Sequence, residues 1–378
     1  MSTSRSRRAL VVQPYVPHYR VPFFERLATE LRSHEVDLTV AHGEPSAALA
    51  ARDDAAALDG AHLLRQTSFR MGRRTLFWRH LSELASRADA VVLEQALHNL
   101  DAYPLLINPR SAPAVALWGH GRTYNKASGV LTRTLNRRLT HRADWFFAYT
   151  QGGADHLAAG GFPSERITVV RNSTDTAPLR EALAAVTPEQ VERFASDHGV
   201  VPERTALFLG SLDESKRIPY LLEAVQHTAR LLPGFTLLVA GDGPQRPLVE
   251  SAAARHKELV YLGPVFGRER ALLGAVAQLM LMPGLVGLCA VDSFALATPM
   301  VTTHWPYHGP EFEYLEHGRN SLIVAGGPER YAEEVVHALS RPDLLARLRD
   351  GCAVDADRCT VREMSRRFAG GVLRMCGA

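Results

Sequence analysis

Short apolar runs alternate along the chain with stretches whose apolar residues recur at helical spacing. In the first half of the sequence these runs predict buried strands at Ala9–Val12, Val36–Ala41, Ala90–Leu93, Ala114–Trp118, Trp145–Tyr149 and Ile167–Val170. The stretches between them predict helices at Val21–Arg32, Thr75–Arg87 and Gly152–Ala159. Because strand and helix alternate, we expect parallel strands joined by crossover helices, which make a doubly wound sheet.

The alternation breaks and then resumes in the second half. Thr187 and Pro188 indicate the start of a polar helix that runs to about His198. A second series of strands follows at Thr205–Leu209, Thr236–Ala240, Leu259–Leu262, Leu279–Met282, Met300–Thr303 and Ser321–Val324. Its helices are predicted at Ile218–Leu231, Gln245–Arg255, Arg268–Ala277, Leu288–Ala297 and Pro328–Ser340.

The chain is therefore predicted to contain two α/β domains, at residues 1–180 and 181–355. The last segment, 356–378, carries a helical pattern over Val361–Met375. This helix can pack on either half, and a return to the first domain is our prediction.

Length and composition agree with this organisation. The 378 residues exceed what one hydrophobic core usually supports. Hydrophobic residues make up 46% and charged residues 22% of the chain, as in ordinary globular proteins. The net charge of +3 gives no reason to expect a nucleic-acid partner. The cysteines form no CxxC pair and no cluster at metal-ligand spacing, so we expect free thiols.

The sequence also limits the membrane association that we expect. Ala9–Val12 is too short for the core of a signal peptide, and no uncharged stretch reaches the roughly 20 residues that span a bilayer. We therefore expect a cytoplasmic protein, at most peripheral to the inner face of a membrane. Residues 122–142 contain basic residues among apolar ones: Arg122, Lys126, Arg133, Arg137, Arg138 and Arg142. They form either a solvated helix face or a contact with anionic lipid or a lipid-linked acceptor.

Candidate chemistry is sought beyond the carboxyl ends of the strands, where open parallel sheets bind ligands. After Leu209 comes a loop that starts with Gly210 and ends in Lys216 and Arg217, directly before a predicted helix. Cations beside a helix N-terminus suit a phosphate. The alternative is a solvated pair of basic residues.

Two further loops of the second half contain glycines. Beyond Met282, the amides of Gly287 and Leu288 are expected at a helix start, free to bind a phosphate oxygen. Asp292, one turn later, either accepts hydrogen bonds from ribose hydroxyls or complements the helix dipole. The turn at Gly241 lacks the GxGxxG spacing and lies in the second half, which argues against a nicotinamide enzyme.

The first half carries polar residues at its strand ends. His120 lies in a Gly-His-Gly turn, where we favour a functional over a structural role. The cluster Glu94, Gln95, His98 and Asn99 faces an acceptor or caps a helix. His304, His308 and Glu311 fit no standard zinc spacing, so we assign no metal.

In their order and spacing these segments resemble retaining glycosyltransferases of the GT-B fold, in group 1 or family 4, from a bacterial polysaccharide or glycoconjugate assembly branch. The resemblance covers nearly the whole chain and rests on Gln13–Phe24, Glu94–Asn99, Leu117–Arg122, Val169–Ser173, Gly210–Arg217, Ala240–Pro244 and Pro283–Ser293. It implies two Rossmann-like doubly wound domains facing each other across a cleft, the first binding an acceptor and the second a nucleotide-sugar. Three positions depart from the family's pattern: Ser211 replaces an arginine, and the family's two glutamates, with seven residues between them, fall on Gly284 and Asp292.

The resemblance also implies roles for individual residues. The catalytic residues would be His120, which touches the transferred sugar, and Lys216. The donor-binding residues would be Ser211, Arg217, Gly241, Val265, Phe266, Gly284, Gly287, Leu288 and Asp292. The acceptor-binding residues would be His18, Arg20, Glu94 and His98. Neither a metal nor a cofactor is implied, because the nucleotide-sugar donor is a co-substrate.

The implied reaction retains configuration at the anomeric carbon. Lys216 and the loop amides would stabilise the leaving diphosphate, whose oxygen can take the proton of the acceptor. The partners would be a nucleotide-sugar donor and a hydroxyl acceptor, which is a glycan, a glycolipid or a secondary metabolite. Three alternatives are a GT-B nucleotide-sugar 2-epimerase, a phosphorylase and a catalytically inactive nucleotide-binding scaffold, and the departures at Ser211 and Gly284 allow the last of these.

Overall fold

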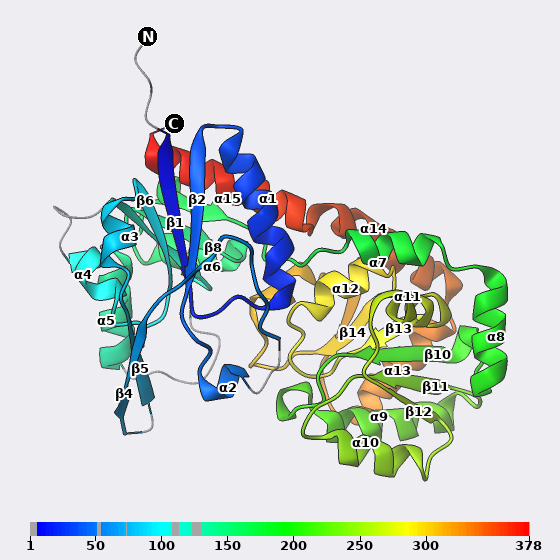
Figure 1. The fold of residues 1–378 in the computed structure, drawn as a ribbon. Coiled ribbons are helices and arrows are strands. Elements are labelled where there is room, and N and C mark those ends of the chain that lie inside the picture. Colours follow the sequence, from blue (N-terminus) through cyan, green and yellow to red (C-terminus); the bar gives the residue numbers. More distant parts are fainter. Residues whose placement is uncertain (1–5, 51–53, 73, 108–112, 123–129, 378) are drawn as a thin grey trace. The chain divides into compact units, whose positions relative to one another are not determined.

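A computed structural model of the protein describes residues 6–50, 54–72, 74–107, 113–122 and 130–377 (Figure 1). The chain divides into two compact α/β units. The first unit comprises residues 1–175 and 361–378, and the second comprises residues 176–360. Among the described residues, none of the helices is both long and apolar enough to span a membrane.

These boundaries differ from the predicted ones at 180 and 355. The division falls after Asp175 and after Thr360, because the flanking residues pack in the second unit. Leu179 and Cys359 both belong to the hydrophobic core of that unit, whereas Val361 belongs to a core of the first. The last helix therefore starts directly where the chain enters the first unit.

The first unit is built on a seven-stranded parallel sheet with strand order β3-β2-β1-β6-β7-β8-β9. Its strands are β1 (Arg7–Gln13), β2 (Val36–His42), β3 (His62–Leu63), β6 (Ala90–Glu94), β7 (Ala114–Gly119), β8 (Trp145–Ala148) and β9 (Ile167–Val169). Its helices are α1 (Val21–Arg32), α2 (Ala47–Ala50), α3 (Ser82–Ser86), α4 (Ala102–Ile107), α5 (Val130–Thr140), α6 (Gln151–Ala159) and α15 (Val361–Cys376), with 3-10 turns η1 (His18–Arg20) and η2 (Ser164–Arg166).

Alternate residues of these strands enter two hydrophobic cores, one on each face of the sheet. Val11 and Phe147 belong to one core, and Val12 and Phe146 to the other, since side chains alternate across a strand. Helix α15 completes the first core, where the ring of Phe368 stacks on that of Phe147 with centroids 4.1 Å apart. The C-terminal helix is thus part of the first unit, as Figure 1 shows.

One predicted helix of this unit, Thr75–Arg87, is wrong. The segment forms strand β5 (Arg74–Arg79) and then the short helix α3. Strand β5 pairs antiparallel with β4 (Gln66–Met71) in a separate two-stranded sheet. Thr75–Trp78 is rich in residues that favour strands, and its partner was missed because most of β4 is polar and exposed.

The second unit has a six-stranded parallel sheet with strand order β12-β11-β10-β13-β14-β15. Its strands are β10 (Thr205–Leu209), β11 (Thr236–Ala240), β12 (Leu259–Gly263), β13 (Leu279–Leu281), β14 (Met300–Thr303) and β15 (Ser321–Val324). Its helices are α7 (Ala177–Ala184), α8 (Pro188–His198), α9 (Ile218–Leu231), α10 (Arg246–Ala253), α11 (Gly267–Val276), α12 (Cys289–Ala295), α13 (Pro328–Leu339) and α14 (Pro342–Arg358), with 3-10 turns η3 (Pro202–Arg204), η4 (Glu214–Lys216) and η5 (Pro310–Tyr314).

Both sheets reverse their winding direction between two neighbouring central strands. In the first unit the reversal lies between β1 and β6, and in the second it lies between β10 and β13. Crevices at the carboxyl ends of such strand pairs are the usual ligand sites of open parallel sheets. The loops after these four strands therefore hold the candidate site residues.

Candidate functional site

In the second unit, the loop after β10 brings Lys216 to the loop after β13. The side chain of Lys216 is only 6% exposed, and its Nζ donates a hydrogen bond of 2.5 Å to the carbonyl oxygen of Leu285. The lysine that the sequence singled out therefore lies against the same loop as Gly287 and Leu288. No ion pair with a carboxylate is present for this ammonium group within the part of the chain that the structure describes.

The amides of Gly287 and Leu288 are available at this loop. Neither donates a hydrogen bond to another described residue, and Leu288 is the N-cap of helix α12. Unpaired amides at the start of a helix are suited to bind an anion. Lys216 and the two amides therefore lie on two neighbouring loops, after β10 and after β13, where the second sheet reverses its winding direction. Together they make this edge of the sheet electropositive.

Gly284 permits the close contact between these two loops. A Cβ atom on Gly284 would lie 2.3 Å from the carbonyl oxygen of Ser215 and 2.6 Å from the carbonyl carbon of Lys216. The φ angle of Gly284 is not positive, so the restriction is steric. Any larger side chain, including the glutamate of the family pattern, would have to move this loop.

We expect Gly284→Ala to lower the free energy of unfolding by about 1–3 kcal/mol, the usual cost of overpacking. Chemical denaturation measures this change. Gly370→Ala in helix α15 is the matched control, because a Cβ there meets nothing within 4 Å and alanine favours a helix over glycine. That control should be slightly stabilising. An unchanged unfolding free energy for Gly284→Ala would contradict the described packing.

Asp213 organises the loop that carries Lys216. Its carboxylate accepts hydrogen bonds from Ser211 Oγ at 2.6 Å, from Ser215 Oγ at 2.5 Å and from the Ser215 amide at 2.8 Å. Burial would raise the pKa of Asp213, but these hydrogen bonds and the charge of Lys216 lower it overall. The hydroxyl group of Ser211, which was predicted to bind the donor, thus donates its hydrogen bond within this loop.

Arg217 supports the neighbouring loop. Its Nη1 donates to the carbonyl oxygen of Pro283 at 3.3 Å and to Thr303 Oγ1 at 3.1 Å, and its guanidinium lies 4.2 Å from the ring centre of Tyr220. The solvated-pair alternative for Lys216 and Arg217 is therefore wrong, since both side chains bond across the loops.

Asp292 has a partner that sequence analysis missed. Its Oδ2 accepts a hydrogen bond of 2.6 Å from Arg270 Nη2, and the carboxylate is 19% exposed. Arg270 lies on α11, and no local pattern links it to a residue on α12. The ribose contact predicted for Asp292 would have to be made beside this ion pair.

The other predicted donor-binding residues lie at the neighbouring strand ends. Gly241 follows β11 and lies against the loop after β10. A Cβ atom on Gly241 would be 1.8 Å from the carbonyl oxygen of Gly210. Val265 and Phe266 lie between β12 and α11, and the Phe266 side chain is 75% exposed. These residues line the same carboxyl edge of the sheet as Lys216.

His308 is a buried residue near this edge whose environment the sequence did not reveal. Its ring stacks on that of Phe312 with centroids 4.2 Å apart, and its Nε2 lies 2.8 Å from the carbonyl oxygen of Thr303. Burial lowers the pKa of His308 to about 4, aided by the charges of Lys216 and Arg217 and opposed by the Thr303 contact. The ring is therefore neutral at pH 7.

The absence of a metal stays a prediction. Within the described ranges, the acidic and histidine groups that come close enough to share an ion are Glu223, His227 and Glu329. The two glutamates are exposed, and none of the three is a predicted site residue.

In the first unit, His120 follows β7 as predicted. Its ring centre lies 5.0 Å from that of Tyr149, and the next amide, of Gly121, donates to Gln95 Oε1 at 3.2 Å. His120 is exposed at the end of β7. Partial desolvation by the surrounding protein nevertheless lowers the pKa of its imidazole, and the negative charge of Glu94 opposes this effect. Its imidazole is thus neutral at pH 7.

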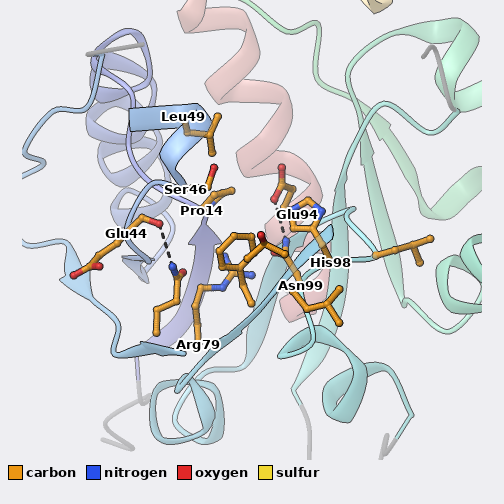
Figure 2. A pocket seen from close by; sticks show the side chains of 13 residues that line it. Pro14, Glu44, Ser46, Leu49, Arg79, Glu94, His98 and Asn99 are labelled. Atoms are coloured by element: carbon orange, nitrogen blue, oxygen red, sulfur yellow. Dashed lines mark hydrogen bonds between the residues drawn. The ribbon is translucent and has the colours of Figure 1, made fainter. Parts of the chain in front are cut away.

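A pocket of about 840 Å³ opens at the winding reversal of the first sheet (Figure 2). It is lined by Pro14, Glu44, Ser46, Leu49, Gln66, Thr75, Leu76, Phe77, Arg79, Glu94, Leu97, His98 and Asn99. In Figure 2, Glu94, His98 and Asn99 lie together on one side of it, and the Glu44 carboxylate points away. Glu94 Oε2 accepts a hydrogen bond of 3.0 Å from Asn99 Nδ2. Two of the four predicted acceptor-binding residues, Glu94 and His98, therefore share one pocket.

Arg79 and Asp101 form a buried ion pair at this pocket that sequence analysis missed. Their side chains are each 1% exposed, and Arg79 Nη2 lies 2.9 Å from Asp101 Oδ2. Arg79 Nη1 is buried without a hydrogen-bond partner among the described residues. The local sequence around Arg79 and around Asp101 gave no indication that these two side chains form a buried pair.

Arg20, predicted to bind an acceptor, is buried in the first unit. It is 4% exposed, and its Nη2 donates to Asn172 Oδ1 at 2.5 Å. Its guanidinium carbon lies between 5.2 and 5.9 Å from four aromatic ring centres, those of Tyr19, Phe23, Trp118 and Tyr149. The charge is held by ring faces, so Arg20 stabilises the strand ends. His18, two residues earlier, is exposed in the loop after β1.

The predicted membrane segment 122–142 is described only in part. Residues 123–129, with Lys126, and the side chain of Arg133 lie outside the described residues. Arg137 and Arg138 are exposed at the end of α5, which suits either of the two interpretations.

Comparison with known proteins matches each unit separately. A family model described as "Glycosyl transferase 4-like domain" matches residues 21–173, and one described as "Glycosyl transferases group 1" matches residues 203–341. Together they match well over half of the chain.

Two curated proteins and many solved structures are similar to this chain. The 2-deoxystreptamine glucosyltransferase of Streptomyces kanamyceticus is 29% identical over 187 residues, 47% of each chain. The alpha-monoglucosyldiacylglycerol synthase of Acholeplasma laidlawii is 23% identical over 188 residues, 48% of this chain and 46% of that protein. The matched region thus spans about half the length of these curated relatives.

The structural likeness extends over the whole chain. The crystal structure of HepE from Anabaena in complex with UDP covers 97% of this chain and 100% of its own, with a TM-score of 0.69 at 15% identity. This likeness shows the fold, and the two family models show the family. The chain belongs to the group 1, family 4 glycosyltransferases and has their GT-B fold of two Rossmann-like domains.

Proposed function

We propose that this protein is a retaining glycosyltransferase that moves a sugar from a nucleoside-diphosphate donor to a hydroxyl acceptor. The second unit would hold the donor and the first unit would hold the acceptor. The observation that carries the proposal is the meeting of the Lys216 ammonium with the loop that bears the amides of Gly287 and Leu288.

The donor site is argued from charge. Lys216 is buried and has only a carbonyl oxygen as its hydrogen-bond partner among the described residues. A buried cation that lacks a carboxylate favours an anionic ligand, and the two amides add donors for the same anion. A diphosphate fits this set, and structures of the similar Anabaena protein contain UDP and UDP-glucose.

The acceptor site is argued from the pocket of the first unit. Its lining combines apolar side chains such as Phe77 and Leu97 with the carboxylate of Glu94 and the amide of Asn99. A sugar or cyclitol ring has an apolar face and a rim of hydroxyl groups, which match these two kinds of lining. The pocket therefore supports a cyclic polyol as the acceptor group.

The proposed reaction breaks the bond between the anomeric carbon and the diphosphate oxygen. Negative charge develops on the leaving diphosphate, where Lys216 and the amides would stabilise it. The acceptor hydroxyl oxygen forms the new bond, and its proton passes to the departing phosphate oxygen. Neutral His120 would exchange hydrogen bonds with the transferred sugar without acting as a base.

A nucleotide panel tests the donor site. UDP, GDP, dTDP and ADP are added separately to the full chain, and the unfolding temperature is measured. We expect UDP to raise it by several degrees, because a ligand at about 100 times its Kd adds about 2.7 kcal/mol of stability. If none of the four raises it, the donor site is wrongly assigned.

Turnover separates the rival functions. An epimerase consumes the donor without an acceptor, whereas a transferase needs one, and an inactive scaffold binds nucleotide without consuming any donor. Proton NMR of the first product formed from a UDP-sugar reports the anomeric configuration. An inverted product would contradict retention while leaving the transferase proposal intact.

A further inference from the structure

Glu94 brings a negative charge to the acceptor pocket that no cation of the protein balances. It is the last residue of strand β6 and lines the pocket, and its Oε2 accepts a hydrogen bond of 3.0 Å from the neutral amide Nδ2 of Asn99. Within the part of the chain that the structure describes, Glu94 forms no ion pair with an arginine, lysine or histidine side chain. The amide of Asn99 therefore orients the carboxylate and leaves its charge in place.

The other charged residues of the pocket lining do not offset Glu94. Among the described residues of the lining, Arg79 is the one arginine or lysine, and Asp101 already balances its charge at 2.9 Å. A second carboxylate, that of Glu44, belongs to the lining but points away from the pocket in Figure 2. The permanent charges of the lining are thus net negative, and a cationic ligand would reduce this charge.

Arg79 offers the pocket a contact of a different kind. Its side chain is 1% exposed, and its Nη1 is buried without a hydrogen-bond partner among the described residues. Because Asp101 balances the charge of the guanidinium group, this N–H donor needs an acceptor oxygen and not a second anion. A hydroxyl oxygen of a ligand meets that need.

Backbone hydrogen bonds fix two sides of the pocket to each other. The amide of Phe77 donates to the carbonyl oxygen of His98 at 2.9 Å, and the amide of Leu100 donates to the carbonyl oxygen of Phe77 at 2.8 Å. Strand β5 of the β4–β5 hairpin, which carries Phe77 and Arg79, is thereby joined to the loop after Glu94. A ligand would meet polar groups that are already positioned, which lowers the entropic cost of binding.

We propose that the acceptor pocket selects a cyclic polyol that carries a protonated amino group, and that Glu94 is the residue that selects it. The ammonium group would donate a hydrogen bond to the Glu94 carboxylate, and a hydroxyl oxygen of the same ring would accept one from Arg79 Nη1. The aromatic ring of Phe77 in the lining also favours a nearby cation. The inference rests on the proposed function, which makes this pocket the acceptor site, and adds the charge of the acceptor.

The position of Glu94 relates the amino group to the reacting centre. Glu94 pairs with Trp118 of the neighbouring strand β7, two residues before His120, and the negative charge of Glu94 acts on the His120 imidazole. An ammonium group held by Glu94 therefore lies at the strand ends that also carry His120. A protonated nitrogen has no lone pair, so a hydroxyl group of the same ring would be the nucleophile.

Calorimetric titration of the full chain tests the selectivity. The probes are methyl α-D-glucoside and its 2-amino-2-deoxy, 3-amino-3-deoxy and 6-amino-6-deoxy derivatives, each of which replaces one hydroxyl by an ammonium group. We expect at least one amino derivative to bind about tenfold more tightly than the glucoside, because charge-assisted hydrogen bonds are roughly twice as strong as neutral ones. Glu94→Gln keeps the shape of the side chain and an acceptor oxygen for Asn99, and it should abolish this difference in affinity.

Two controls make the result specific. Glu83→Gln removes a carboxylate that is 76% exposed on helix α3, outside the pocket, and the preference for the amino derivative should persist. The N-acetylated form of the preferred derivative is uncharged and should bind no more tightly than the glucoside. Circular dichroism and the thermal shift with UDP show whether the Glu94→Gln variant is folded.

Three outcomes would overturn the proposal: no binding of any amino derivative, equal binding of the amino derivatives and the glucoside, and a preference that survives in the folded Glu94→Gln variant. The transferase proposal fails by other measurements, namely the UDP shift and turnover. Transfer to the glucoside without any preference for an amine would refute the inference alone. Selective binding of an amine without transfer to any acceptor would refute the transferase alone.

Discussion

Replacing Lys216 by alanine is expected to lower kcat by about 10²–10³-fold, the usual effect of removing one preorganised donor to a developing negative charge. The reason is that the ammonium lies buried against the 283–288 loop and has no carboxylate partner among the described residues. Its loss leaves only the amides of Gly287 and Leu288 for the leaving diphosphate. Steady-state kinetics with a UDP-sugar and calorimetry with UDP measure the two expected losses, in rate and in affinity.

Lys257→Ala is the matched control for this variant. Lys257 is exposed in the second unit and lies outside the site, so its removal should leave kcat unchanged. Circular dichroism of both variants checks that the fold is intact. If Lys216→Ala folds and keeps the wild-type rate and UDP affinity, the electrostatic account of the donor site is wrong.

Replacing Asp101 by alanine is expected to lower the free energy of unfolding by about 3–5 kcal/mol. Both side chains of the Arg79–Asp101 pair are 1% exposed, and Arg79 donates three further hydrogen bonds of 3.1–3.2 Å to the Asp101 carboxylate. Without Asp101, the guanidinium would remain buried and uncompensated. Denaturant titration of the full chain measures the loss.

Two variants show whether burial is the cause. Glu83→Ala breaks the Arg87–Glu83 pair of similar length, 2.7 Å, whose side chains are 63% and 76% exposed; its effect should stay within roughly 0.5 kcal/mol. Arg79→Met combined with Asp101→Ala removes both charges and should recover much of the stability. A loss below about 1 kcal/mol for Asp101→Ala would be inconsistent with a buried charge pair.

The strands of the second unit show what a sequence can predict. All six were predicted to within one residue at each end, because strands buried on both faces are short continuous apolar runs and their burial is uniform in β10, β11 and β14. The hairpin shows the opposite case. Arg74–Arg79 has an apolar content that suits a helix or a strand, and only its pairing with the exposed β4 decides between them.

The predicted site residues show the same contrast between features that the local sequence predicts and features that it does not. Lys216, Gly287, His120 and Glu94 were predicted as site residues because topology places strand ends at one edge of a parallel sheet. Their contacts were not found. Lys216 meets a carbonyl 69 residues away, and Arg270 meets Asp292 across 22 residues, so no local pattern contains either pair.

The sequence by itself determined two doubly wound sheets, the edge of each at which ligands bind, and the family, because these depend on hydrophobic periodicity and on short motifs. Only the tertiary structure decided which charges are paired. In the fold, Arg20 is buried among aromatic rings, Arg79 pairs with Asp101, and Gly284 lies in close contact with the backbone of Ser215. The physical reason is that the energy of a charge depends on its distance to other groups and on its access to water, and folding sets both through residues far apart in the chain.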